Sequence, residues 1–338
     1  MATLKKTAVL LINTGSPERP DPAAVREYLA EFLSDQRIVE LPRWKWWPIL
    51  HGIILRVRPK KSAELYRHIW TEEGSPLIVN TRRVAEALEK AFVGTSLEGV
   101  RVFWSMRYGK PSVAEVCQAM KAEGIERLLV FPHFAQYCPH TTVSCVDAVY
   151  QVALKERSFP QCRVLEDYYV HPAYIEALRA RVSAYWETHP SAVKKGGKLL
   201  MSFHSVPVAG VEKGDVYRDR CYATAKALQR ALGLTNEQVE VCFQSRFGRD
   251  PWVEPFAIDR ASALAKDGVP LDVMCPGFAC DCLESLEEIG LSLAQTYREN
   301  YQGSEPLHYG YVLALNDSPE AIEAYMTIMK EELAGWIE

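Results

Sequence analysis

No long hydrophobic run interrupts this chain of 338 residues. No window approaches the ~18 uncharged apolar residues that a membrane-spanning helix needs, so we expect no spanning segment. No charge of one sign dominates either. The formal net charge of −4 gives no electrostatic reason to expect nucleic-acid binding. With 48% hydrophobic and 24% charged residues and no low-complexity segment, the composition is typical of a soluble globular protein.

A disulfide framework is missing as well. The chain has nine cysteines, an odd number scattered over its length, whereas small secreted domains carry an even number at regular spacings. We therefore expect most of them to be small apolar side chains in a reducing compartment. The apolar run near the amino terminus extends only from Ala8 to Ile12, too short for the core of a signal peptide. We interpret it as the first strand of a cytoplasmic protein.

What the sequence does have is an alternation of β-rich apolar runs with helical patterns. This predicts an α/β fold with parallel sheets flanked by helices. The order recurs after residue 170, which favours two similar α/β halves, 1–170 and 171–338, around a cleft, although no internal repeat is strong enough to indicate duplication. Strands are predicted at 6–12, 99–104, 126–133, 163–168, 197–203, 239–244, 270–276 and 306–313. Helices are predicted at 21–34, 79–93, 111–123, 141–156, 172–188, 217–232, 254–267, 282–299 and 318–335.

One segment, 42–61, departs from this pattern. It combines three tryptophans and several leucines and isoleucines with six Lys or Arg residues and no acidic residue. Such a segment is typical of a lip that contacts lipid headgroups or an apolar, anionic ligand. It is equally compatible with a partly buried connection whose basic side chains are solvated. The sequence leaves both interpretations open.

A histidine stands at the end of one predicted strand. In KLLMSFHSVP, the apolar residues from Leu199 to Phe203 predict a buried strand, and Ser205 and Pro207 end it. His204 thus marks the edge at which open α/β sheets bind their ligands. From position alone, a hydrogen-bonded structural histidine is the more frequent case. A functional role for His204 needs support from the rest of the chain.

A row of carboxylates begins after another predicted strand. In CPGFACDCLESLEEIG, Asp281, Glu284 and Glu288 have the i, i+3, i+7 spacing of one helix face. Carboxylates near a helix amino terminus stabilise the helix through its dipole, which is the structural interpretation. The functional interpretation is a track of oxygen ligands that conducts protons or a hydrated divalent cation. Nearby cysteines at 275, 280 and 282 do not have a standard zinc or iron–sulfur spacing.

Further strand ends supply aromatic, amide and guanidinium groups. An aromatic ring beside arginines suits a flat anionic ligand. Together with the histidine and the acidic row, these groups predict a broad pocket for a large, flat, partly anionic molecule. They are Arg107 and Tyr108, Gln136 and Tyr137, and Arg246, Arg249 and Trp252.

Several separate motifs make the chain resemble the ferrochelatases over nearly its whole length. They are LLINTGSPERP with AVREYLAEFLSD, SPLIVNTRR, MRYGKPS, FPHFAQYCPHTTVS, MSFHSVP with KGDVYRDRC, FQSRFGRDPWVEP and CPGFACDCLESLEEI. The resemblance implies the chelatase fold, two Rossmann-like halves around a porphyrin cleft. It also implies a lyase that inserts ferrous iron into protoporphyrin IX in the final step of haem biosynthesis.

The resemblance assigns roles to individual residues. His204 and Glu284 match the facing catalytic and metal-handling pair, and Asp281 and Glu288 match the proton or metal path on the same helix. His204 is expected to accept the pyrrole protons, since histidine side chains titrate near working pH. The porphyrin-binding residues implied are Thr14, Arg58, Tyr66, Arg107, Tyr108, Gln136, Tyr137, Arg246 and Trp252, with Arg249 as a further candidate for neutralising propionates.

Two positions depart from the family pattern. Some members have histidine where this chain has Cys282, so a role of that histidine cannot be transferred. Members that act on coproporphyrin usually have tyrosine at the position of Thr14, so the chain resembles the protoporphyrin-using branch.

The partners that we expect are a porphyrin and ferrous iron. No cofactor is predicted beyond the iron substrate, and no [2Fe–2S] cluster. We expect a cytoplasmic protein without a nucleic-acid partner, with peripheral contact to the inner face of the membrane through 42–61. Three alternatives stay open: a cobalt or nickel chelatase acting on another tetrapyrrole, a porphyrin carrier without turnover, and a cysteine-ligated electron-transfer protein.

Overall fold

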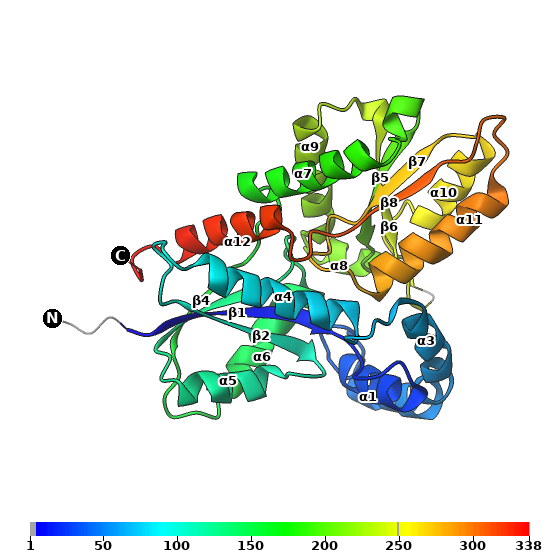
Figure 1. Ribbon diagram of the computed structural model, residues 1–338. Coiled ribbons are helices and arrows are strands. Elements are labelled where there is room, and N and C mark those ends of the chain that lie inside the picture. Colours follow the sequence, from blue (N-terminus) through cyan, green and yellow to red (C-terminus); the bar gives the residue numbers. More distant parts are fainter. Residues whose placement is uncertain (1–4, 249, 338) are drawn as a thin grey trace. The chain divides into compact units, whose positions relative to one another are not determined.

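The computed structural model describes residues 5–248 and 250–337. The chain divides into two compact units, one made of Met1–Asp167 with Tyr325–Glu338 and the other of Tyr168–Ala324. Each unit contains one four-stranded parallel sheet, with its helices packed against the faces of that sheet (Figure 1). We refer to them as unit 1 and unit 2.

The sheet of unit 1 has the strand order β2-β1-β3-β4. The central strand β1 pairs in parallel with both neighbours, and its residues from Ala8 to Ile12 are completely buried. Such a strand is covered on both faces, which is why its sequence is continuously apolar. Figure 1 shows α4 on one face and α5 and α6 on the other. The strands are β1 (Thr7–Gly15), β2 (Arg101–Tyr108), β3 (Arg127–Pro132) and β4 (Gln161–Val164). The helices that connect the later strands of this sheet or precede them are α4 (Pro76–Ala91), α5 (Val113–Ala122), the π-helix η2 (Pro139–Val143) and α6 (Ser144–Ala153).

Helices also fill the segment between the first strand and α4. They are α1 (Pro22–Phe32), α2 (Arg43–Ile49), the π-helix η1 (Leu50–Ile54) and α3 (Leu55–Ile69). The first of these was predicted and starts as expected, because the Asp21 carboxylate accepts the backbone N–H groups of Ala23 and Ala24. The helices in 42–61 were not predicted. Pro48 and Pro59 lie inside them, and prolines usually mark a helix end.

The sheet of unit 2 has the strand order β6-β5-β7-β8. One side of it packs against α10, the π-helix η5 and α11, whose apolar residues form a core cluster with the strands (Figure 1). The strands are β5 (Lys198–His204), β6 (Val239–Gln244), β7 (Leu271–Met274) and β8 (Tyr309–Val312). The helices are α7 (Pro172–Thr188), η3 (Val193–Lys195), α8 (Val208–Glu212), α9 (Tyr217–Ala231), η4 (Asn236–Gln238), α10 (Ala257–Lys266), η5 (Leu283–Leu293) and α11 (Ala294–Asn300). The last helix, α12 (Pro319–Glu332), begins in unit 2 and belongs to unit 1 from Tyr325 onward.

The end of the chain returns to unit 1. Within that unit, the ring of Tyr325 packs edge-on against Phe131 and His133 of the β3 end. The guanidinium groups of Arg127 and Arg163 lie over the ring of Trp336, at 5.7 and 4.2 Å from its centroid. The structure therefore differs from the predicted division, which placed the whole of 171–338 in the second half.

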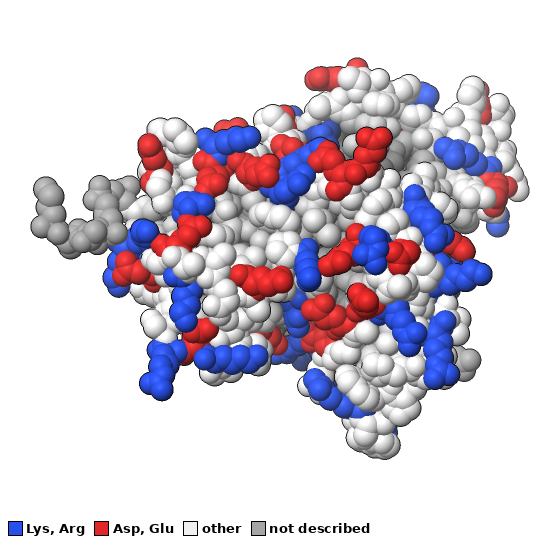
Figure 2. Space-filling view, turned by 60° about the horizontal axis from the view of Figure 1, so that its bottom comes forward, with Lys and Arg blue, Asp and Glu red and all other residues white. Residues whose placement is uncertain are grey.

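The predicted α/β class with two Rossmann-like halves is confirmed by the two parallel sheets and their order. The cleft between the halves stays a prediction. Among the described residues, no helix is both long enough and apolar enough to cross a membrane. Figure 2 shows basic and acidic side chains interspersed over the face in view, as expected from the small net charge.

Candidate active site

The imidazole of His204 is held at the end of β5 in unit 2. Its Nδ1 atom lies 2.6 Å from the carbonyl oxygen of Ser205. A carbonyl oxygen only accepts hydrogen bonds, so Nδ1 must carry the proton of this contact. In the neutral ring, Nε2 then has a free lone pair. His204 can therefore accept a proton or bind a metal ion through Nε2.

The acidic row lies on a π-helix rather than an α-helix. Residues Leu283–Leu293 form η5, which continues as α11. The i→i+5 bonds of a π-helix give a wider turn, and such turns are frequent at functional sites. Glu284 and Glu288 lie within η5, whereas Asp281 precedes it, so the predicted common helix face does not include Asp281.

Glu288 is held by the residue that follows β6. The backbone N–H of Ser245 donates to its Oε1 at 2.9 Å, and the Ser245 hydroxyl donates to its Oε2. Ser245 has a φ of 64°, which is uncommon for a residue other than glycine. Burial raises the pKa of Glu288, as does the charge of Glu284, while the Ser245 hydrogen bonds and His204 oppose the shift. Glu288 therefore keeps its proton to a higher pH than an exposed glutamate does.

Asp281 is buried, with 2% of its surface exposed. Its carboxylate accepts hydrogen bonds from the Ser285 hydroxyl at 2.9 Å, the Tyr311 hydroxyl at 2.8 Å and the Asn316 amide at 2.7 Å. These bonds join the start of η5 to β8 and the loop after it. Asp281 thus orders the start of the acidic helix. Its participation in a proton or metal path stays a prediction.

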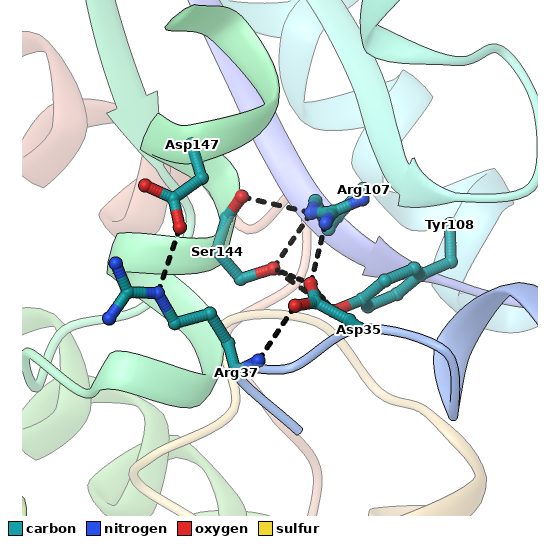
Figure 3. Close-up of polar contacts among 6 residues, drawn as sticks. All are labelled: Asp35, Arg37, Arg107, Tyr108, Ser144 and Asp147. Carbon is teal, nitrogen blue, oxygen red and sulfur yellow. Dashed lines mark hydrogen bonds and ion pairs between the residues drawn. The ribbon is translucent and has the colours of Figure 1, made fainter. Parts of the chain in front are cut away.

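The residues Arg107 and Tyr108 belong to a polar cluster in unit 1 (Figure 3). The Arg107 guanidinium lies 2.5 Å from the Asp35 carboxylate and donates to the Ser144 hydroxyl at 2.7 Å. The Tyr108 hydroxyl donates to Asp35 at 2.8 Å, and Tyr108 is only 1% exposed. Burial raises the pKa of Asp35, but hydrogen bonds from Ser144, Arg37 and Tyr108 and the Arg107 charge outweigh it, so the net shift is downward.

Arg107 and Tyr108 therefore already have partners within unit 1. The prediction that they bind a porphyrin is untested, but the charge of Arg107 is partly neutralised by Asp35 and Tyr108 presents almost no surface. The second ion pair of the cluster joins Arg37 and Asp147 at 2.8 Å and lies at its more exposed side.

The other predicted porphyrin-binding residues are distributed over both units. In unit 1, Gln136 and Tyr66 are buried, whereas Arg58 is exposed. In unit 2, Arg246 is exposed with its guanidinium over the Phe256 ring, and the Trp252 indole donates to the carbonyl of Phe247 at 2.8 Å. Thr14 and Tyr137 are partly buried in unit 1, and Arg249 lies outside the described residues.

Two residues of this site, Gln244 and Ser245, were not predicted from the sequence. Gln244 is the last residue of β6, the neighbour of β5, and pairs in register with His204. Ser245 follows it. The rule that ligands bind at strand ends applied to them as it did to His204. They were not predicted because neither side chain titrates, and the sequence prediction relied on acidic and basic groups.

Comparisons with known proteins agree with one another. The family model described as Ferrochelatase matches residues 6–333. A ferrochelatase of Azoarcus is 44% identical over 98% of this chain and 89% of its own length, and one of Neisseria meningitidis serogroup A is 45% identical over 98% and 95%. Among solved structures, SirB from Bacillus subtilis with Fe3+ is similar with a TM-score of 0.57 and 14% identity, covering 98% of this chain and 96% of that one. That likeness concerns the fold alone.

Proposed function

Because the chain belongs to the ferrochelatase family, we propose that it inserts ferrous iron into protoporphyrin IX to form protohaem. This is the reaction of a metal chelatase, a lyase, and it releases two protons from the pyrrole nitrogens. The observation that carries the residue assignment is a histidine whose tautomer is fixed by a backbone carbonyl and whose charge acts to lower the pKa of Glu288 in η5. Both lie in unit 2.

His204 is the proposed acceptor of the pyrrole protons. Its Nδ1–H donates to a backbone carbonyl, an arrangement that orients the ring and leaves Nε2 as the accepting nitrogen. General-base catalysis of this kind contributes about 10²–10⁴-fold to a rate. A clamp on the rim of the macrocycle would add to this by tilting the pyrrole nitrogens toward the base.

Glu284 and Glu288 are the carboxylates proposed to take up the protons that leave the site or to bind iron as it enters. Glu288 has a raised pKa because it is buried and lies near Glu284, so it can take up and release a proton closer to neutral pH. Asp281 supports this route by holding the start of the helix.

Protoporphyrin is the proposed porphyrin because this chain has Thr14 rather than tyrosine at a position that separates the two branches in the family resemblance. The exposed arginines are the proposed partners of the propionates, since guanidinium groups bind carboxylates in a bidentate manner. The full set proposed to contact the porphyrin is Thr14, Arg58, Tyr66, Arg107, Tyr108, Gln136, Tyr137, Arg246 and Trp252.

The location that we propose is the cytoplasm, with peripheral contact of the 42–61 segment to the membrane. The helices there expose large apolar side chains, Trp44 at 74%, Ile53 at 60% and Val57 at 70%. The segment 42–61 contains six Lys or Arg residues and no Asp or Glu, a combination suited to anionic headgroups. We also propose that no iron–sulfur cluster is bound, because the cysteines at 275, 280 and 282 do not have the spacing of a cluster site.

An anaerobic insertion assay tests the proposal. The protein is supplied with Fe²⁺ and either protoporphyrin or coproporphyrin, and metalloporphyrin formation is followed by absorbance. We expect turnover with Fe²⁺ and a clear preference for protoporphyrin. Preference for coproporphyrin would contradict the branch assignment. Porphyrin binding without turnover with Fe²⁺, Co²⁺ or Ni²⁺ would show a carrier instead.

A further inference from the structure

The backbone of Gln244 is linked to His204 by two successive hydrogen bonds. Gln244 is the last residue of β6 and stands opposite His204 in the register of β5 and β6. Its carbonyl oxygen accepts the N–H of Ser205 at 2.7 Å. The carbonyl of Ser205 in turn accepts the Nδ1–H of His204 at 2.6 Å. The group that fixes the tautomer of His204 is therefore itself fixed by the backbone of Gln244.

The side chain of Gln244 connects to the acidic helix. Its Nε2 donates to the carbonyl of Glu284 at 2.6 Å and lies 3.4 Å from Oε2 of Glu288. Its Oε1 accepts the hydroxyl of Ser202 at 2.7 Å. With 3% of its surface exposed, Gln244 is buried, so these bonds do not compete with water.

Only an amide satisfies both ends of this arrangement. A carboxylate in the same place would accept from Ser202 but could not donate to Glu284 and would repel Glu288. An apolar side chain of similar size would leave the Ser202 hydroxyl and the Glu284 carbonyl without this partner, which is costly for buried groups.

We propose that Gln244 is a positioning residue for metal insertion, one that holds His204 and the Glu284–Glu288 helix in a fixed relation. The inference rests on the proposed function, since it takes the roles of these three residues from there. Gln244 does not act on the porphyrin or on iron. It acts by keeping the proton acceptor and the carboxylates in place while protons leave and iron enters.

The variants Gln244→Leu and Gln244→Glu test this inference in the full chain. We expect kcat for iron insertion to fall by about 10- to 100-fold in both, the usual effect of removing an outer hydrogen-bond partner, with the porphyrin KM unchanged. The acidic limb of the kcat–pH profile should move to higher pH, and further in Gln244→Glu because the added negative charge disfavours ionisation of Glu288. Gln229→Leu is the matched control, since Gln229 also donates to a carbonyl, that of Leu234, at the far end of α9.

Three outcomes would overturn the inference. One is near-normal kcat with an unmoved pH profile in Gln244→Leu. Another is a rise in porphyrin KM without a fall in kcat. The third is failure of both variants to fold, judged by circular dichroism, because residue 244 would then be a core residue only. His204→Ala separates the two levels: if it is inactive while the Gln244 variants are normal, only the inference fails, whereas an active His204→Ala removes the proposed site itself.

Discussion

At the scale of single residues, the sequence predicted the groups that titrate but not those that hold them. His204 and Glu288 were identified from their positions after strands and from the family resemblance. Ser245 and Gln244 were missed because their importance lies in hydrogen bonds that only the folded chain forms. For Arg107, the residue type alone predicted a cation available to a ligand, whereas the structure pairs it with Asp35.

The titration of Glu288 gives a prediction at this scale. Its folded-state pKa is raised by burial, so it becomes protonated as the pH falls through a value above the usual range of glutamate. If its carboxylate form is needed for turnover, kcat falls on the acidic side around that raised value. Glu288→Gln should lower kcat and abolish this acidic limb, as measured by kcat–pH profiles. Glu299→Gln, an exposed position on α11, is the control, and a limb retained in Glu288→Gln would assign it to another group.

At the scale of elements, the strands and most helices followed from periodicity, because apolar runs and amphipathic repeats record which face is buried. The predicted helix 282–299 exists as η5 with α11. Its π geometry was not predictable, since the sequence pattern does not distinguish i→i+5 from i→i+4 bonding there. The helices of 42–61 were not predicted because Pro48 and Pro59 lie inside them.

Asp281 gives the prediction at the scale of elements. Asp281→Asn keeps the shape but turns an amide toward the Asn316 amide, so at least one buried hydrogen bond of the cluster is lost. We expect the free energy of unfolding to fall by roughly 1–3 kcal/mol. Urea denaturation measures it, with the exposed Asp259→Asn on α10 as the control. Equal stability of the two variants would show that the Asp281 cluster does not hold the helix start.

At the scale of the whole molecule, the two sheets were predictable and the return of the carboxyl terminus was not. The alternation of strands and helices fixes the class, and a linear pattern carries no information on which sheet a final helix joins. The rings of Tyr325 and Trp336 make that choice by packing on residues of unit 1. Such long-range contacts appear only in the folded chain.

The return of the carboxyl terminus predicts a large stability effect. Trp336 is 6% exposed and lies beneath two arginines of unit 1. Trp336→Ala should therefore destabilise the protein by about 3–5 kcal/mol, as for other buried tryptophans. Thermal unfolding measures it, and Trp44→Ala, at a 74% exposed ring, should leave the midpoint unchanged. A small effect of Trp336→Ala would mean that the return contributes little.

The exposed segment 42–61 predicts a property of the molecule in the presence of lipid. Trp44→Ala should reduce co-sedimentation with anionic vesicles and leave binding to neutral vesicles, which we expect to be weak, unchanged. Leu154→Ala is the control, because Leu154 is 79% exposed outside this segment. Equal binding of wild type and Trp44→Ala would exclude the segment as the lipid contact.

The measurement that tests the central claim most directly is the rate of iron insertion by His204→Ala, with protoporphyrin binding measured on the same preparation. His189→Ala, an exposed histidine of unit 2, is the matched control. The account predicts that His204→Ala loses about 10²–10⁴-fold in insertion rate and binds porphyrin as wild type does, while His189→Ala is normal. Near-normal insertion by His204→Ala would contradict it.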